Sequence, residues 1–132
     1  MNESRAGYST KSLKEKLGIK DGAAVYIVRA PAGYLKALGV ENAPNGPVAF
    51  IQLFARSVAE VETLFPVLKN RMTIDGMLWV SWPKKASGVK TDLDENVIRG
   101  LGLAQGLVDV KVVAVDDTWS GLKFVYRLKD RK

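Results

Sequence analysis

The sequence predicts a three-layer α/β domain with a mostly parallel sheet, and three observations support this prediction. Short runs of apolar and β-branched residues at 23–31, 48–54 and 75–82 have the composition of strands buried on both faces. Segments with helical features lie before, between and after these runs. The chain then closes with two alternating strands and a short turn between them, which can join antiparallel neighbours but cannot make a parallel crossover.

The first helix is predicted from its end signals. Ser12 and Glu15 have capping-box spacing, and Gly18 can end a helix, so residues 12–17 are predicted to be helical. After the first buried strand, residues 32–39 leave room only for a short helix.

A longer helix is predicted after the second strand. Apolar residues recur at helical spacing through residues 57–72, and Ser57 and Glu60 form a second capping-box pair. Pro66 lies inside this pattern, where proline costs about 3 kcal/mol in an ordinary helix interior. We therefore expect a kink or a break at Pro66.

The last helix and the closing hairpin complete the prediction. A turn at Asp75 and Gly76 is expected to lead into the third strand, and Thr91 has capping spacing to Asp94 at the start of the next helix. Two alternating strands, at residues 108–115 and 122–128, then form a hairpin with one partly solvated face.

Length and charge predict one domain, residues 1–132, with basic ends. Residues 1–20 carry five Lys/Arg and two Glu, and residues 127–132 carry four basic residues and one acidic residue. Within the basic C-terminal end, residues 128–132 are expected to form a short, mobile tail. The span between the basic ends, 21–126, is neutral. A nucleic-acid partner is therefore not expected, because phosphate affinity needs a concentrated basic surface.

The chain contains no histidine and no cysteine. This composition excludes the Ser-His-Asp triad, thiolate chemistry and histidine or cysteine metal ligands. We assign no catalytic residue and no metal site, and an enzyme of this composition would depend on carboxylates, Lys, Tyr or backbone groups. No stretch suggests export or a membrane span, so a cytoplasmic location without membrane contact is expected.

The order of elements, with "DGMLWVSW" followed by a helix and "GLVDVKVVAVDDTWSGLKFVYR", resembles the second half of class I S-adenosylmethionine-dependent methyltransferases. The opening "KLGIKDGAAVYIVRAP" is similar to the lead-in to the first strand of that family. The resemblance implies a Rossmann-like five-stranded sheet of order 1-2-3-5-4, with strand 5 antiparallel.

The chain departs from the methyltransferase pattern where that family binds its cofactor. The family has a glycine-rich turn after the first strand and a carboxylate after a second strand, whereas this chain has "VRAPAGYL" at the turn and too few residues for the missing strands. We therefore expect no cofactor and no measurable affinity for S-adenosylmethionine.

A second resemblance covers nearly the whole chain. The blocks "GYS", "KLGIK", "LWVSWPKKASG", "TDL" and "DDTWSGLKFVYR" resemble an uncharacterised family of small bacterial proteins, a domain of unknown function. Membership of that family would identify relatives of this chain, but it would not predict an activity.

Polar and aromatic residues follow the ends of two predicted strands. Ligands bind beyond the carboxyl ends of parallel strands in such sheets, so these residues form a candidate ligand site. One or two lysines would hold an anionic group, a tryptophan would stack on a flat ligand, and aspartates would accept hydrogen bonds. The candidate residues are Trp82, Lys84, Lys85, Ser87, Asp116, Asp117, Trp119 and Ser120.

A structural interpretation of the same loop stays open beside the ligand site. Asp92, Asp94 and Glu95 begin the next helix and could pair with Lys84 and Lys85. The tryptophans would then only cap the sheet edge.

The sequence favours a noncatalytic ligand-binding or protein-interaction module. Its partner would be an anionic small molecule or another protein, and the oligomeric state is left open. The alternative is a small enzyme, methyltransferase-like or another transferase, that acts on an anionic metabolite. The absence of histidine and of a glycine-rich turn favours the module.

Overall fold

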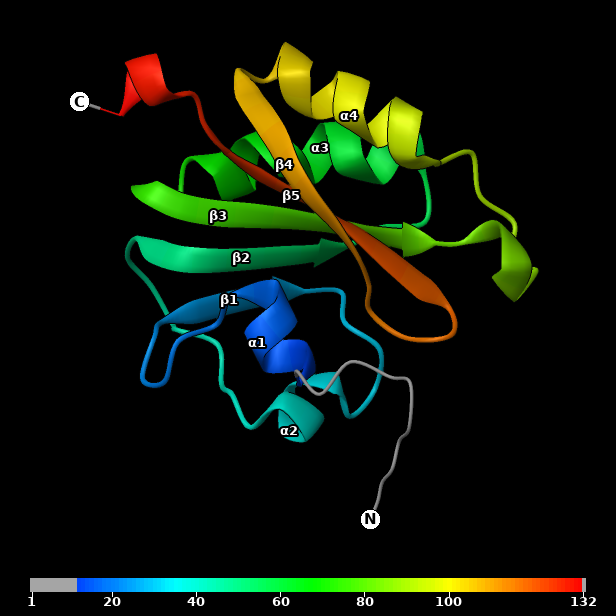
Figure 1. Ribbon diagram of the computed structural model, residues 1–132, viewed down its shortest axis with the longest axis horizontal. Coiled ribbons are helices and arrows are strands. Elements are labelled where there is room, and N and C mark those ends of the chain that lie inside the picture. The colour runs from blue at the N-terminus through cyan, green and yellow to red at the C-terminus, as the bar shows by residue number, and fades with distance from the viewer. Residues whose placement is uncertain (1–11, 132) are drawn as a thin grey trace.

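The computed structural model describes residues 12–131 and contains one five-stranded sheet (Figure 1). Its strand order is β1-β2-β3-β5-β4; the first three strands are parallel, and β5 pairs antiparallel with both β3 and β4. The predicted α/β class, strand order and direction of the last strand are therefore confirmed. The strands are β1 (Val25–Val28), β2 (Val48–Phe54), β3 (Met72–Pro83), β4 (Leu107–Ala114) and β5 (Trp119–Tyr126).

Helices cover both faces of the sheet and bury an apolar cluster on each (Figure 1). On one face lie α1 (Leu13–Leu17) and α2 (Tyr34–Leu38), whose side chains join a cluster around Trp79. On the other face lie α3 (Val58–Lys69) and α4 (Glu95–Ala104), with Phe65 and Phe124 in contact between them and the sheet. Two apolar layers thus hold the three-layer architecture together.

The predicted start and end of α1 are both confirmed. The hydroxyl of Ser12 accepts the Glu15 N–H, the Glu15 carboxylate accepts the Ser12 N–H, and Gly18 ends the helix in the left-handed region. The buried indole of Trp79 donates to the Leu17 carbonyl at 3.0 Å. Because this hydrogen bond satisfies an open carbonyl at the helix end, it fixes α1 against β3.

Two local predictions are wrong, and of the kink or break expected at Pro66 the break does not occur. Helix α3 runs through Pro66 without a break and ends three residues later, at Lys69. Strand β3 begins at Met72 and includes the expected turn at Asp75 and Gly76, with an irregular register opposite β2. The N-cap of α4 is Asp94, because Thr91 binds elsewhere.

Gly102 in α4 is required by packing. A Cβ atom at this position would lie 2.0 Å from the ring of Phe124, on β5. The helix therefore approaches the sheet as closely as it does because residue 102 has no side chain.

The outer edge of β1 is closed by a side chain. The amide of Asn42 accepts the Ile27 N–H at 2.7 Å and donates to the Ile27 carbonyl at 2.8 Å, while the Ala43 N–H binds the Val25 carbonyl. These contacts take the place of a neighbouring strand, so the edge presents fewer free backbone groups for aggregation.

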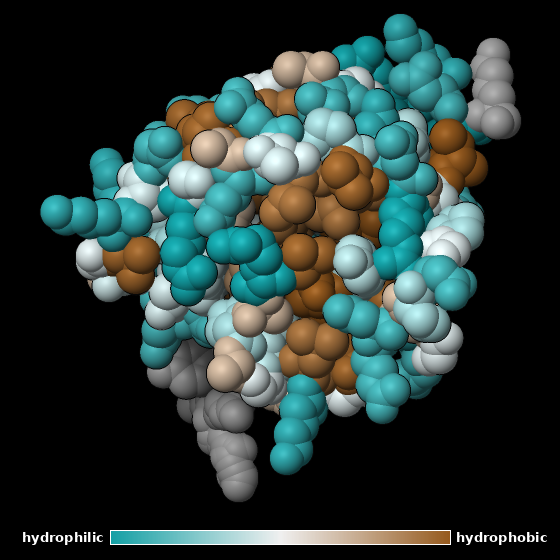
Figure 2. All heavy atoms as spheres, turned by 180° about the vertical axis from the view of Figure 1, so that it is seen from behind, coloured by the Kyte–Doolittle hydropathy of each residue, from teal (hydrophilic) through white to brown (hydrophobic). Residues whose placement is uncertain are grey.

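The surface seen from behind has a central band of apolar side chains framed by hydrophilic ones (Figure 2). At the C-terminal end, a single 3₁₀ turn at Leu128–Asp130 follows β5. Within residues 12–131 no helix is long and apolar enough to cross a bilayer.

A buried chain of polar groups crosses the sheet beneath α2. The Tyr34 hydroxyl donates to the Gln52 side-chain oxygen at 2.8 Å, and the Gln52 amide donates to the Ser81 hydroxyl at 3.1 Å. Gln52 and Ser81 are fully buried. Burial raises the pKa of the Tyr34 phenol to about 12, so the hydroxyl stays protonated and keeps donating.

We expect Tyr34→Phe to destabilise the protein by about 1–3 kcal/mol, because it leaves a buried Gln52 oxygen without its donor. The raised pKa favours the neutral phenol in the folded state, so this contribution is present below pH 10 and is lost as the pH rises toward 12. Urea unfolding of both proteins at pH 7, and tyrosine absorbance titration between pH 9 and about pH 12, test this. Tyr34→Phe should remove the tyrosine that titrates at the highest pH. If it instead removes one that titrates near pH 10, the raised pKa of Tyr34 is contradicted.

Candidate functional site

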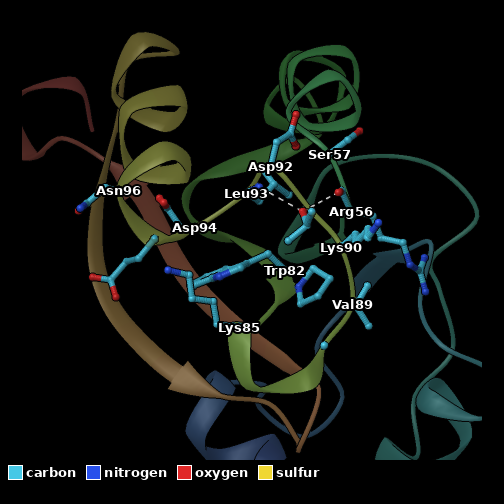
Figure 3. A pocket seen from close by; sticks show the side chains of 14 residues that line it. Arg56, Ser57, Trp82, Lys85, Val89, Lys90, Asp92, Leu93, Asp94 and Asn96 are labelled. Atoms are coloured by element: carbon cyan, nitrogen blue, oxygen red, sulfur yellow. Dashed lines mark hydrogen bonds between the residues drawn. The ribbon is translucent and has the colours of Figure 1, made fainter.

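An open groove of about 1040 Å³ lies at the carboxyl ends of β2 and β3 (Figure 3). It is lined by the β2–α3 turn, by the end of β3, and by the loop that leads into the first turn of α4. Trp82 lies centrally among the lining side chains. The position is the one where ligands bind in open parallel sheets.

The loop beneath the groove is held by two hydrogen bonds to the β2–α3 turn. The Thr91 hydroxyl donates to the Arg56 carbonyl at 2.6 Å, and one Asp92 carboxylate oxygen accepts the Val58 N–H at 2.8 Å. Ser57, the N-cap of α3, accepts the Glu60 N–H. The first turn of α3 is therefore capped partly by its own residue and partly by the loop.

The other two carboxylates of the groove serve α4. Asp94 accepts the Val97 N–H at 2.8 Å as the N-cap, and Glu95 pairs with Arg99 one turn later. Arg99 also binds Asp109 on β4 at 2.8 Å, and both hydrogen bonds raise the pKa of its guanidinium. The acidic groups of the groove are thus engaged within the fold.

The basic side chains of the groove have no such partners. Arg56, Lys85 and Lys90 line it and are exposed, and none forms an ion pair within the described residues. The pairing of Lys84 and Lys85 with the acidic start of α4, which the structural interpretation allowed, does not occur in this part of the chain. The groove therefore combines engaged carboxylates with cations that have no carboxylate partner in the described chain.

Of the eight candidate residues, the structure places Trp82 and Lys85 in the groove. The expected convergence on one surface is incomplete. The candidates that do not line the groove are Lys84, Ser87, Asp116, Asp117, Trp119 and Ser120.

The two tryptophans lie on opposite faces of the sheet, which corrects the expectation that they share a surface. Trp82 is buried in the cluster beneath α3 and α4, and Trp119 is buried in the cluster beneath α1 and α2. Trp119 packs edge-on against Phe54 at 5.0 Å between ring centroids. The reason is register: Trp119 is opposite Pro83 in the ladder, and Trp82 is opposite Ser120, so their side chains alternate.

Several other candidates have local structural contacts. One Asp116 oxygen accepts the N–H groups of Thr118 and Trp119, both at 2.8 Å, and so shapes the β4–β5 turn. The Ser87 hydroxyl donates to the Lys84 carbonyl at 2.6 Å. The Lys84 N–H donates to the Thr118 carbonyl, which ties the two loops together.

Arg56 connects the groove to Trp119. Its guanidinium carbon lies 5.1 Å from the centroid of the indole ring, a cation–π arrangement at the edge of the sheet. Arg56 thus lies at the boundary between the two faces.

The turn after β1 has an unusual conformation. Arg29 has a φ of 61°, the one positive φ outside glycine among residues 12–131. Its side chain binds a Glu60 oxygen at 3.0 Å, and the second Glu60 oxygen accepts the Arg56 N–H at 2.7 Å. Glu60 therefore fixes the ends of β1 and β2 to α3.

Comparison with solved structures gives methyltransferase folds at low sequence identity. Ribosomal protein L11 methylase from Lactobacillus delbrueckii subsp. bulgaricus has a TM-score of 0.59 and 13% identity, over 87% of this chain and 75% of that protein. Magnesium protoporphyrin IX methyltransferase from Synechocystis PCC 6803 with bound SAH has a TM-score of 0.52 and 14% identity, over 70% of this chain. LepI in complex with SAM has a TM-score of 0.52 and 10% identity, over 87% of this chain.

The chain spans 55% of the length of the protoporphyrin methyltransferase and 39% of LepI. Comparison with family models gives no match, and neither does comparison with curated proteins. Membership of the uncharacterised bacterial family stays a prediction, whereas the methyltransferase-like fold is confirmed.

The expectation of a noncatalytic module is corrected by these neighbours. They include two methylating enzymes and a SAM complex, so the fold that the chain shares with them is one that enzymes use. The alternative, a small enzyme, agrees better with this finding.

Sequence reasoning missed two features of the groove. Lys90 received no role, although it lies in the same loop as Lys85. Asp92 was expected to complement the helix that follows it, but it caps the preceding helix, α3. Only the tertiary contact between residues 34 positions apart defines that role.

We expect Asp92→Ala to lower the free energy of unfolding by about 0.5–2 kcal/mol, because the Val58 N–H loses its acceptor. Asp117→Ala is the matched control: Asp117 is exposed, has no hydrogen bond within the described residues, and should change stability by about 0.5 kcal/mol at most. Urea unfolding measures both variants. Equal effects of the two substitutions would show that the Asp92 cap does not stabilise α3.

Proposed function

We propose that this protein is a small transferase with a methyltransferase-like fold, and that it acts on an anionic small molecule bound in the groove. The observation that supports this proposal is the arrangement of charges in the groove. Asp92, Asp94 and Glu95 are engaged as helix caps or ion-pair partners, whereas the cations of the groove have no carboxylate partner in the described chain.

The position and size of the groove support a small-molecule ligand. Ligand sites of small molecules usually enclose about 300–1000 Å³, and the groove has a volume of about 1040 Å³. The guanidinium of Arg56 can donate two hydrogen bonds to a carboxylate or phosphate. Lys85 and Lys90 can each form an ion pair with such a group. These residues are assigned to binding.

The residues after β1 do not fit S-adenosylmethionine in the position that the methyltransferase resemblance implies. Arg29 is fixed there by its bond to Glu60, in a backbone conformation that a side chain rarely adopts. The outer side of β1 is occupied by Asn42, so no neighbouring strand brings a carboxylate to that edge. We therefore place the working site in the groove and derive no step through this cofactor.

The chemistry available to the chain supports a transfer reaction that depends on alignment. The sequence has no histidine or cysteine to act as base or nucleophile. Holding two reactants in a productive geometry can supply about 7–11 kcal/mol of a barrier without such groups. The cations of the groove would orient the anionic reactant against its partner.

A thermal-shift screen of nucleotides, phosphorylated metabolites and carboxylates tests the site. At least one anion should raise the unfolding midpoint, because a ligand at 100 times its Kd stabilises by about 2.7 kcal/mol. Lys85→Ala/Lys90→Ala should abolish this shift and change the stability of the free protein by about 0–1 kcal/mol per lysine. S-adenosylmethionine, included in the screen, should give no shift.

Lys36→Ala/Lys129→Ala is the matched control, since it removes the same charge from exposed lysines outside the groove. An undiminished shift in the Lys85/Lys90 variant would contradict the anion site. Mass spectrometry of the bound anion after incubation with a metabolite extract tests the transferase part. Tight binding with no change in the mass of the anion would contradict catalysis while leaving the binding site intact.

The single-domain organisation over residues 1–132, the bacterial family and the cytoplasmic location stay predictions. Each agrees with the proposed small transferase and none is needed for it.

A further inference from the structure

Two lysines face each other on the side of the sheet opposite to α3 and α4. Lys111 on β4 is the direct ladder partner of Lys123 on β5, and Lys123 is also the ladder partner of the buried Trp79 on β3. Since directly opposed residues project to the same side, both lysines lie on the α1/α2 face, to which Trp79 belongs. This face is distinct from the cluster beneath α3 and α4 that contains Trp82.

The pair places two like charges side by side, and only Lys111 has a hydrogen-bond partner for its ammonium group in the described chain. Like charges directly opposite one another on neighbouring strands destabilise a sheet. Lys123 is half-buried, and burial followed by the charge of Lys111 lowers the pKa of its ammonium. A residue with high β-propensity would suit this position in a central strand better than lysine does.

The partners that could compensate the pair are engaged elsewhere. The Lys111 ammonium donates to the carbonyl of Lys16 at 2.9 Å, and the side chain of Lys123 has no hydrogen bond or ion pair within the described residues. Asp109, close in sequence to Lys111, binds Arg99 on α4, because the irregular register between Asp109 and Lys111 separates their side chains. Arg99 and Lys14, two other half-buried cations, are paired with carboxylates, whereas, within residues 12–131, Lys123 is not.

We propose that Lys111 and Lys123 form a binding site for a phosphate group, independent of the groove. A phosphate group carries at least one negative charge and several acceptor oxygens, so it would accept hydrogen bonds from both ammonium groups and offset their mutual repulsion. The phosphate can belong to a small phosphorylated molecule or to a nucleic-acid strand, and the test distinguishes these two sources.

The test uses inorganic pyrophosphate and a short oligothymidylate as probes, in the Lys85→Ala/Lys90→Ala background. This background removes the groove lysines. A negative result at Lys111 and Lys123 can therefore be distinguished from a negative result at the proposed transferase site in the groove. Isothermal titration should show pyrophosphate binding that weakens at least tenfold in Lys123→Gln and in Lys111→Gln. Lys111 is exposed on the edge strand β4, so Lys111→Gln should fold normally.

Two further results make the assignment specific. Without ligand, Lys123→Gln should have a higher unfolding midpoint than its parent, because the repulsion is removed. Lys123→Arg, which keeps the charge, should retain binding.

Pyrophosphate binding that depends on both lysines supports the proposal and a free phosphorylated source. Binding of oligothymidylate alone, with the same dependence, supports a nucleic-acid source. Binding of neither probe, or binding that both Gln variants retain, would overturn the site.

Discussion

The fold around the groove depends on one contact, the capping of α3 by Asp92. The carboxylate reaches the Val58 N–H from a loop that follows β3, and Thr91 binds the Arg56 carbonyl beside it. These hydrogen bonds join the carboxyl ends of β2 and β3 and set the distance between the first turns of α3 and α4. They also remove Asp92 from competition for nearby cations. The same contact therefore shapes the groove and removes a carboxylate that could pair with its lysines.

The edge of the sheet at β1 is closed by side chains and not by a further strand. With β1 at the edge, Asn42 takes over the backbone pairing that a further strand would provide. Arg29, held by Glu60, occupies the turn where close approach of a cofactor would need glycine. The sheet is methyltransferase-like, and a groove opens at the carboxyl ends of β2 and β3.

Much of the fold could be predicted because its signals are local. The buried run at Val48–Phe54 defines β2 to the residue, and the Ser12/Glu15 box and Gly18 define α1. The site was harder because the register between β3 and β5 decides whether Trp82 and Trp119 share a face, and the sequence does not display that register. The roles of Asp92 and Lys90 depend in the same way on a contact between distant segments. Pro66 was misjudged because tertiary packing of α3 outweighs its local cost.

The central claim is that ligands bind in the groove and not at the turn after β1. The most direct measurement is two-dimensional amide NMR during titration with the anion that most raises the unfolding midpoint. Binding in the groove should concentrate the chemical-shift changes at residues 56–58 and 85–96 and leave residues 29–34 unchanged. Changes concentrated at residues 29–34, with the groove unaffected, would contradict it.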